Sequence, residues 1–565
     1  MFSKETIEEA KKKEEEWKKK VSEVYEKKLN FKPRKYTTSS GIPLKYVYFP
    51  SDIENAEIDV PGEYPYTRGL RPLSYQYMPW MIQMLHGYGL PEETRKRTEK
   101  LMREGMAGYG GQPVFLVQLD MPTTFGYDPD TPEARGWVGV AGASIFTLED
   151  IDALLRGFDL KKTRFAPNCR NTDIPMLSMY IAYAEGRGYK PGELNGQSQN
   201  RLKTTWMCSN VPCFRPKEQL KLQIELIKYT TLNMPRWNHT NLCGYILGES
   251  CASPVEELAF ILAEVIELTE AGIEAGLNPD DFVPRFSTQM HMGMDFFEGI
   301  AKIRAARKMW AEIMKERFNC KNPRSLQFRI HVQTSGRSLT GQQPLNNIAR
   351  TTLQVLACTL AGVQSIHTAS YDEALGLPTE EAARTAMRIN QIILHETNIP
   401  AVTDPLGGSY YVEWLTERVK EEAQKVLDEI ERRGGFVKCM ESGWFSSKLG
   451  EQMHRLYDEI EKKERIIVGV NKFTVEEEEK IPIFEINQEE VERRAIERIK
   501  KWKENRDKSK VESALDNVRK VAEKYESLDQ AGNLLPAMIE AAKVKCTLGE
   551  MTRVLYDVYG MVFAF

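Results

Sequence analysis

The segment from Gln327 to Thr379 constrains the fold more than any other part of the chain. It begins with an alternating apolar run at 328–332, which predicts a strand, and it continues into a polar loop. An apolar stretch with helical spacing spans 344–360, and a second strand-like run at 363–366 leads into another polar loop. This order predicts a parallel βα array, in which binding sites lie just beyond the strand ends.

The same alternation extends from Tyr64 to about Asp404. Strand-like segments include 114–119, 163–166, 240–246 and 285–287, and helical segments include 149–155, 174–185, 254–275 and 296–318. So many βα units predict an α/β fold whose parallel sheet closes into a (β/α)8 barrel. We expect this barrel to occupy residues 64–410.

The two ends of the chain differ in character from the barrel region. Residues 1–63 contain the charged helical run 4–29, which either lies on the surface or grips another subunit. Residues 411–565 are mostly amphipathic helix, with long helical runs predicted at 414–431 and 488–524 and a last helical pair at 534–565. We therefore expect an N-terminal arm and a helical C-terminal extension.

Composition excludes several classes of protein. The 565 residues carry a net charge of -4 without a concentrated basic face, which argues against a nucleic-acid partner. No apolar run approaches the ~18 residues of a membrane span. The nine cysteines form no CxxC pair and no metal-ligand spacing, so we expect idle thiols in the cytoplasm and no bound metal.

A few polar residues stand out from their surroundings. His331 and Gln333 alternate along one predicted strand and therefore face the same side. Glu249 and Glu373 lie near predicted helix starts, where acidic residues most often serve as caps. The chain has no GxSxG elbow and no phosphate-binding glycine loop. Residue patterns alone predict a barrel enzyme of unknown reaction, and a metal-using barrel enzyme is an alternative that lacks a ligand cluster.

Ten ordered motifs carry a resemblance to a known family. They are YPYTRG (64–69), RGWVGVAG (135–142), NMPRWN (233–238), VPRFS (283–287), KIRAAR (302–307), RIHVQTSG (329–336), QSIHT (364–368), YDEALGLPT (371–379), DPLGGSYYVE (404–413) and VGVNKF (468–473). Together they resemble the large, catalytic subunit of the methylmalonyl-CoA mutase family. The resemblance implies a (β/α)8 barrel that holds an acyl-CoA along its axis.

The resemblance also implies a reaction and a cofactor. The family consists of isomerases that use adenosylcobalamin for radical 1,2-rearrangements of acyl-CoA carbon skeletons. The cobalamin domain of the family carries an Asp-X-His-X-X-Gly motif, and none of the seven histidines here fits it. We therefore expect a split enzyme, in which a separate small subunit carries the corrinoid and two large and two small subunits form a heterotetramer.

Site residues follow from the resemblance position by position. Tyr245 and Glu249 match residues near the adenosyl group, Glu373 matches a carboxylate on its ribose, and Gln199 matches a glutamine near the thioester. His331, Gln333 and Gln364 match groups that line the corrin face or the substrate channel. Arg285 and Ser287 match contacts to the CoA.

Several positions depart from the family pattern on the substrate side. Ile246 stands where the family has its active-site histidine, Ser209 where it has the carboxylate-binding arginine, Leu85 where it has a tyrosine, Gln83 where it has an arginine, and Arg71 where it has another tyrosine. Because a carboxylate site loses its geometry without a bidentate arginine, methylmalonyl-CoA itself is disfavoured.

These departures predict a different, bulkier acyl group. An alkyl- or arylsuccinyl thioester would fit if Arg71, Arg170 or Arg337 faced inward, and Arg201 is a further unusual arginine. Two alternatives stay open, namely a non-catalytic acyl-CoA-binding or scaffold subunit and methylmalonyl-CoA mutase proper.

Overall fold

The computed structural model describes residues 2–29, 35–200, 206–208, 211–477 and 480–563. Its centre consists of two parallel sheets with strand orders β1-β10-β9-β8-β7 and β2-β3-β4-β6. The strands are β1 (Met81–Ile82), β2 (Val114–Gln118), β3 (Arg164–Asn168), β4 (Asn195–Gln197), β6 (Trp237–Asn238), β7 (Thr240–Cys243), β8 (Phe286–Met292), β9 (Ile330–Thr334) and β10 (Ser365–His367).

The two sheets join at both seams and form one ring. At the first seam only His239 separates β6 from β7, and the backbone N–H of Asn241 donates to the carbonyl of Gln199 at 3.0 Å. At the second seam the backbone N–H of Gln118 donates to the carbonyl of His86 at 2.8 Å. The predicted (β/α)8 barrel is therefore confirmed, with β6 and β7 acting as one strand position.

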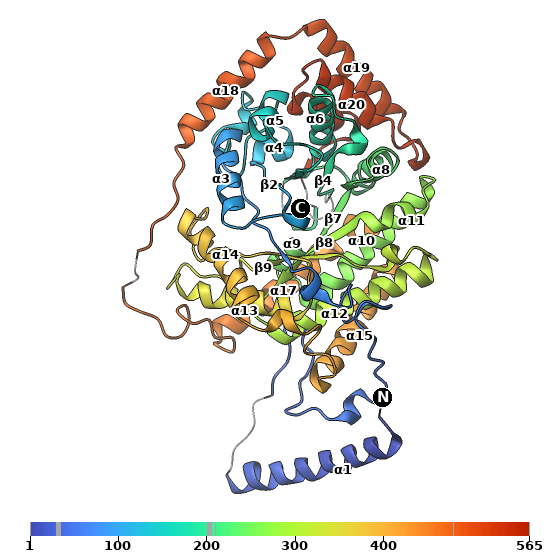
Figure 1. Ribbon diagram of the computed structural model, residues 1–565, viewed down its shortest axis with the longest axis vertical. Coiled ribbons are helices and arrows are strands. Elements are labelled where there is room, and N and C mark those ends of the chain that lie inside the picture. The colour runs from blue at the N-terminus through green and yellow to red at the C-terminus, as the bar shows by residue number, and fades with distance from the viewer. Residues whose placement is uncertain (1, 30–34, 201–205, 209–210, 478–479, 564–565) are drawn as a thin grey trace.

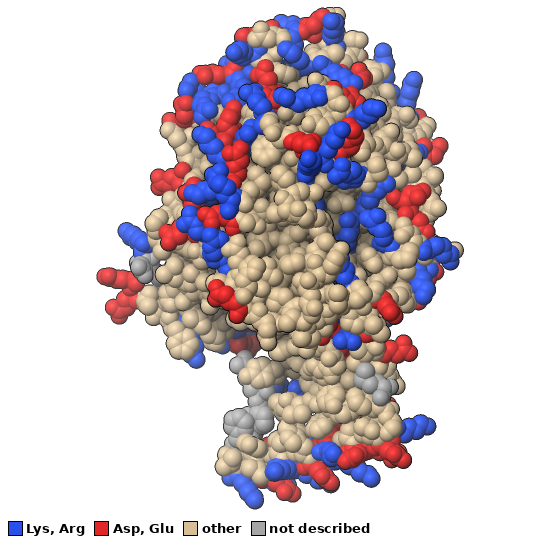
Figure 2. All heavy atoms as spheres, in the orientation of Figure 1, with Lys and Arg blue, Asp and Glu red and all other residues tan. Residues whose placement is uncertain are grey.

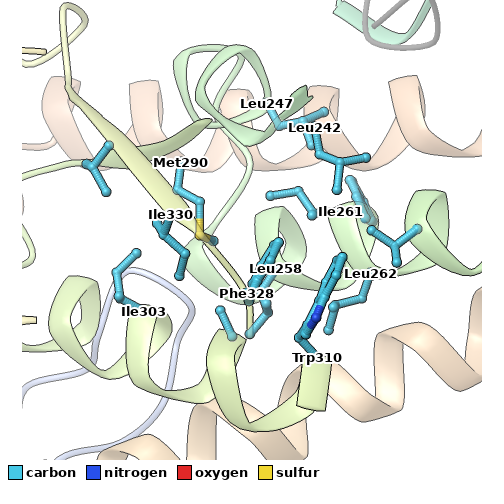
Figure 3. Packing of buried hydrophobic residues seen from close by; sticks show 14 of the residues in the cluster. Leu242, Leu247, Leu258, Ile261, Leu262, Met290, Ile303, Trp310, Phe328 and Ile330 are labelled. Carbon is cyan, nitrogen blue, oxygen red and sulfur yellow. The ribbon is translucent and has the colours of Figure 1, made fainter. Parts of the chain in front are cut away.

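Helices surround the strands on the outside (Figure 1). They include α3 (Pro91–Arg103), α5 (Leu148–Leu155), α6 (Asp173–Glu185), α8 (Pro216–Asn233), α10 (Pro254–Glu274), α12 (Phe296–Glu312), α13 (Asn346–Leu360) and α14 (Glu380–His395). Outward-facing side chains such as Met290 and Ile330 pack against α10 and α12 (Figure 3). The rings of Trp310 and Phe328 stack there with centroids 4.2 Å apart. Strand residues of one parity thus build the core, and those of the other parity face the barrel axis.

Several predicted boundaries were wrong for local reasons. The run 240–246 ends as a strand at Cys243, because Gly244 begins the short helix α9 (Gly244–Glu249). A Cβ at Gly244 would lie 2.4 Å from Ile261 Cδ1, so only glycine allows the chain to turn this close to α10.

Other boundary differences concern helix ends. The run 488–524 is two helices, α18 (Gln488–Glu504) and α19 (Lys508–Lys524), because the Asp507 side chain accepts from the N–H of Lys510 and starts a new helix. The helix expected from 344 begins at Asn346, and the one expected to reach 318 ends at Glu312, followed by a π-helical turn at Ile313–Arg317.

The two ends of the chain lie outside the barrel. Helix α1 (Lys4–Val21) stands apart from the main body, and α18 and α19 cross its opposite end (Figure 1). Helix α15 (Tyr410–Arg432) packs beside α12, and α20 (Leu534–Lys543) packs beside α6. Within the described ranges, no helix combines the length and the apolar character that a bilayer crossing requires.

Candidate active site

A narrow cavity of about 60 Å³ lies on the barrel axis. Inward-facing side chains from every strand position of the ring line it. They include six residues that the sequence singled out, namely Gln83, Leu85, Gln199, Ser287, His331 and Gln364. The structure thus brings together predicted residues that are far apart in the sequence.

Three further predicted residues meet at the carboxyl-terminal mouth of the barrel. Tyr245 and Glu249 are four residues apart on α9 and therefore share one helix face. A Cβ placed on Gly336 would lie 3.3 Å from Glu249 Oε2, 3.4 Å from Tyr245 Oη and 3.8 Å from Glu373 Cγ. The three side chains therefore converge on Gly336, and any side chain at that position would press against them.

Glu249 is held in its charged form. Its oxygens accept from Ser335 Oγ at 3.0 Å and from the backbone N–H of Arg337 at 2.8 Å. His291 Nε2 lies 3.1 Å from Glu249 Oε1, as a close contact rather than an aligned hydrogen bond. Burial raises the pKa of Glu249, but His291, Arg337 and Ser335 together outweigh it and bring the pKa below its ordinary value.

Glu373 behaves in the opposite way. Burial, the nearby charge of Glu249 and the charge of Asp372 raise the pKa of Glu373 to about 7. The two carboxyl groups at the mouth therefore differ in protonation near neutral pH, with Glu249 an acceptor and Glu373 able to donate as well as accept.

The raised pKa of Glu373 predicts a pH-dependent stability. The folded protein binds this proton more tightly than the unfolded chain does. Protonation of Glu373 therefore contributes fully to the free energy of unfolding below the unfolded pKa of about 4.3, and this contribution is lost as pH rises through about 7. Glu373→Gln cannot lose a proton, so we expect its denaturation midpoint to rise relative to that of wild type between pH 5 and 8. Parallel midpoints across that range would contradict the assignment.

Sequence reasoning missed His291, which lies under Glu249 at the end of β8. Gly248 makes room for its ring, since a Cβ at Gly248 would lie 2.4 Å from His291 Cγ. Its backbone N–H donates to Glu257 Oε1 at 2.8 Å, which anchors the strand end to α10. The alternation of side chains along the strand could have identified it. His291 lies on the same face of the strand as Ser287, which the sequence analysis did select.

The three polar residues predicted on the corrin or channel side have defined partners. His331 Nδ1 and Ser365 Oγ share a hydrogen bond of 2.7 Å, and burial, His367 and Arg164 lower the pKa of His331 to about 3, so the ring is neutral. Gln333 Oε1 accepts from Gln289 Nε2 at 2.5 Å. Gln364 Oε1 accepts from the backbone N–H of Ile330 at 2.8 Å, so this oxygen ties β10 to β9.

Two arginines that the sequence reasoning did not select line the amino-terminal end of the cavity. Arg164 donates to Gln197 Oε1, and Arg329 donates from Nη2 to the carbonyl of Phe286 at 2.9 Å. Burial lowers the pKa of Arg329 to about 10, and its buried Nε has no hydrogen-bond partner. Within the described ranges neither guanidinium forms an ion pair with a carboxylate, so this end of the cavity is cationic.

The remaining predicted residues lie elsewhere. Arg285 donates to backbone carbonyls at the end of α8, including that of Thr230 at 3.0 Å, and Arg71 lies in a loop outside the cavity. Ile246 is half-buried on α9, and Arg337 Nη1 lies 2.8 Å from Cys251 Sγ. Ser209 and Arg201 fall outside the described residues.

A wider cleft of about 1210 Å³ opens beside the mouth, and His291, Ser335 and Arg337 line its inner side. The exposed side chains Met294 and Phe297 line it as well. Figure 2 shows a broad area of uncharged side chains over the region where α9, β8 and β9 lie. In the described part of the chain, no three His, Cys, Asp or Glu residues are grouped so that they could hold a metal ion.

Comparison with known proteins agrees with this geometry. The family model described as methylmalonyl-CoA mutase matches residues 37–561. The chain belongs to the methylmalonyl-CoA mutase family. It is 37% identical to human mitochondrial methylmalonyl-CoA mutase over 93% of this chain and 68% of that protein. It is 36% identical to the 2-hydroxyisobutanoyl-CoA mutase large subunit of Aquincola tertiaricarbonis over 94% of each.

Membership of this family confirms the class of enzyme expected from the motifs. The chain is an isomerase, an adenosylcobalamin-dependent acyl-CoA mutase. The cluster around Gly336 fits such a cofactor, because it lies beyond the strand ends and contains two carboxyl groups that can bind ribose hydroxyls.

Proposed function

We propose that this chain is the catalytic large subunit of a split acyl-CoA mutase whose substrate is not methylmalonyl-CoA. The observation that carries the proposal is the meeting of Tyr245, Glu249 and Glu373 around Gly336, beyond the carboxyl-terminal ends of the strands that enclose an axial cavity. Such a cavity keeps water away from a reactive intermediate, which is the main contribution a protein makes to radical chemistry.

In this proposal Tyr245, Glu249 and Glu373 hold the adenosyl end of the cofactor, with His331, Gln333 and Gln364 nearer the corrin or the channel. When bound, the cofactor supplies the organic radical that removes a hydrogen atom from the substrate. Gln199 contacts the acyl thioester, and Ser287 and Arg285 contact the CoA. Glu249 stays ionised and accepts hydrogen bonds, while Glu373 donates or accepts.

A separate small subunit is proposed to carry the corrinoid. The relative named as a large subunit supports this proposal, since this chain spans 94% of it, compared with 68% of the human enzyme. The uncharged area over the barrel mouth suits a partner of this kind (Figure 2). The protruding α1 suits a second large subunit, which would complete a cytoplasmic heterotetramer.

The substrate is proposed to be a divergent acyl-CoA. Leu85 and Gln83 line the cavity where the family pattern has a tyrosine and an arginine, so the side chains at these two positions are uncharged and differ in shape from those of the family. An alkyl- or arylsuccinyl group would require a cation close to the acyl end. Arg71 and Arg337 do not line the cavity, and the guanidinium of Arg170 lies 6.0 Å from the centre of the Phe125 ring.

Arg164 and Arg329, at the amino-terminal end of the axial cavity, suit the phosphates of CoA. We expect Arg329→Met to raise the KM for an acyl-CoA about 10- to 100-fold with little change in kcat, because a charge-assisted hydrogen bond contributes about 1.5–3 kcal/mol. Arg324→Met is the matched control, since Arg324 is exposed and does not line the cavity. Equal effects of the two substitutions in steady-state kinetics would count against this assignment.

The proposed function is tested by reconstitution. The chain is mixed with a cognate small subunit, adenosylcobalamin and a panel of acyl-CoA thioesters, and the radical is followed by electron paramagnetic resonance and the products by mass spectrometry. We expect a radical signal and an isomerised thioester with at least one member of the panel. Binding of thioesters without a radical signal would favour the non-catalytic acyl-CoA-binding subunit. Efficient turnover of methylmalonyl-CoA would favour methylmalonyl-CoA mutase proper.

A further inference from the structure

A hairpin of the N-terminal arm is fastened to the helices that surround the barrel. Residues 36–44 form it, and the backbone N–H of Thr38 donates to the carbonyl of Ile42 at 2.9 Å across the turn. Gly41, with a φ of +84°, makes this turn possible. We call the segment the arm hairpin. Its own hydrogen bonds are local, so its place on the barrel depends on contacts with residues far along the chain.

Two acidic side chains at the start of α12 hold the arm hairpin. Asp295 Oδ2 accepts from the backbone N–H of Ser39 at 2.7 Å, and Glu298 Oε1 accepts from Thr38 Oγ1 at 2.8 Å. The backbone N–H of Ser40 lies 3.3 Å from each carboxyl oxygen of Glu298. Thr38 and Glu298 are 5% and 0% exposed, so their hydrogen bond is shielded from water. Three donors of one short turn therefore depend on two carboxyl groups.

These two carboxyl groups also contact each other. Asp295 and Glu298 form a hydrogen bond through their side chains, which requires a proton on one of them. Burial and the negative charge of Asp295 raise the pKa of Glu298 to about 7, and the donors Ser40 and Thr38 offset this only in part. Near neutral pH the pair is therefore close to losing its shared proton.

The other charged and titratable side chains around the pair do not replace that proton. They are Lys302 on α12, Tyr411 on α15, Arg455 on α17 (Trp444–Glu461) and Glu256 on α10. The ammonium of Lys302 donates to Glu257, and Arg455 donates to the carbonyl of Ser39. Burial and the charge of Asp295 raise the pKa of Tyr411 above its ordinary value, so its hydroxyl stays neutral. Within the described residues, none of these groups forms an ion pair with the two carboxyl groups.

The arm hairpin forms one wall of the wide cleft beside the barrel mouth. The residues that it contributes to the lining are Tyr36, Thr37, Ser39 and Leu44. Asp295 lines the same cleft, so the attachment lies at the edge of the opening. Movement of the hairpin away from α12 would therefore widen the cleft.

We propose that the arm hairpin is a clasp on this cleft, closed while Asp295 and Glu298 share a proton and opened when that proton is released to solvent. Two carboxylates held side by side repel each other, and the opened hairpin lets water reach both. The clasp lies outside the candidate active site, and it does not depend on the proposed function.

The test is hydrogen exchange of the full-length chain, measured by mass spectrometry on the peptide that contains residues 36–44. The rates are corrected for the pH dependence of exchange in an unstructured chain. Opening gives Glu298 an ordinary pKa of about 4.3, so the stability of the closed clasp is complete below that pH and is lost as pH rises to about 7. We expect the corrected exchange rate to rise about tenfold per pH unit between about pH 5 and 7 and to level off above pH 7.

Substitutions separate the clasp from other effects of pH. Glu298→Gln keeps an acceptor for Thr38 but cannot lose a proton, so its hairpin should exchange at the same corrected rate from about pH 5 to 8. Glu312→Gln is the matched control on the same helix, since Glu312 is paired with Lys420, and it should keep the wild-type pH dependence. Glu373→Gln should keep it too, although the pKa of Glu373 is also about 7.

A second variant keeps the inference testable if Glu298→Gln does not fold. Asp295→Asn removes the charge that raises the pKa of Glu298, so the corrected exchange rate should level off at a lower pH than in wild type. Corrected exchange of residues 36–44 that is flat across this range in wild type would overturn the inference. The same conclusion would follow if Glu298→Gln kept the wild-type pH dependence, or if Glu373→Gln abolished it.

Discussion

Replacing Gly336 by valine is expected to lower turnover about a hundredfold or more, because misplacing a reacting group by about 1 Å costs that much. A Cβ at this position already comes within 3.3 Å of Glu249 Oε2 and 3.4 Å of Tyr245 Oη, and the two methyl groups of valine would displace these side chains. Gly336 and the three side chains around it are only partly buried and can shift, so we expect little change in the free energy of unfolding. The measurements are kcat and the Kd for the small subunit loaded with adenosylcobalamin.

Gly341 provides a matched control in the same loop. A Cβ there would meet only Leu375 Cδ2, at 3.4 Å, so Gly341→Ala should leave both quantities close to wild type. If Gly336→Val turned over substrate at the wild-type rate, the cluster of Tyr245, Glu249 and Glu373 would not be the cofactor site. A fall in kcat for both variants would instead indicate a general effect of loop rigidity.

Replacing Lys302 by methionine is expected to destabilise the fold by about 3–5 kcal/mol, the usual cost of breaking one partner of a buried ion pair. The side chains of Lys302 and Glu257 are each 1% exposed, and Lys302 Nζ donates to Glu257 Oε2 and to the backbone carbonyl of His291. Losing the ammonium leaves a buried carboxylate unpaired directly beneath the candidate site. Urea denaturation gives the change in the free energy of unfolding.

Lys308→Met is the control on the same helix. Its ion pair with Glu417 is partly exposed, so its loss should cost at most about 1 kcal/mol. The double variant Lys302→Met/Glu257→Leu should recover part of the lost stability, because it no longer leaves a charge uncompensated. Equal destabilisation by Lys302→Met and Lys308→Met would show that the buried pair is not what holds the end of β8.

Local patterns were sufficient for the class of fold. Apolar runs such as 114–119 and the helical spacing of 254–275 correspond to β2 and α10 within one residue at each end. The boundaries that failed depend on contacts remote in the sequence or on single caps. Gly244 ends a strand because α10 lies against it, and Asp507 starts a helix through one side-chain hydrogen bond.

The site was predictable only in part. The motifs led to Tyr245, Glu249 and Glu373, which the structure places around Gly336. They did not lead to His291, Arg164 or Asn241. Each of these residues lies in a strand without a distinctive sequence pattern, and its role depends on residues of neighbouring strands in the barrel. Arg285, selected by resemblance, binds the end of α8 in this structure, and its contact with CoA stays a prediction.

The sequence by itself determined the alternation of strands and helices, the parity that divides core from axis, and membership of the mutase family. Those properties can be predicted from the order of residue types along short stretches of the chain. Tertiary structure alone decided that Arg164 and Arg329, which form no ion pair within the described residues, come together at one end of the axial cavity. Their meeting exists only after the ring closes, because the two residues are distant in sequence.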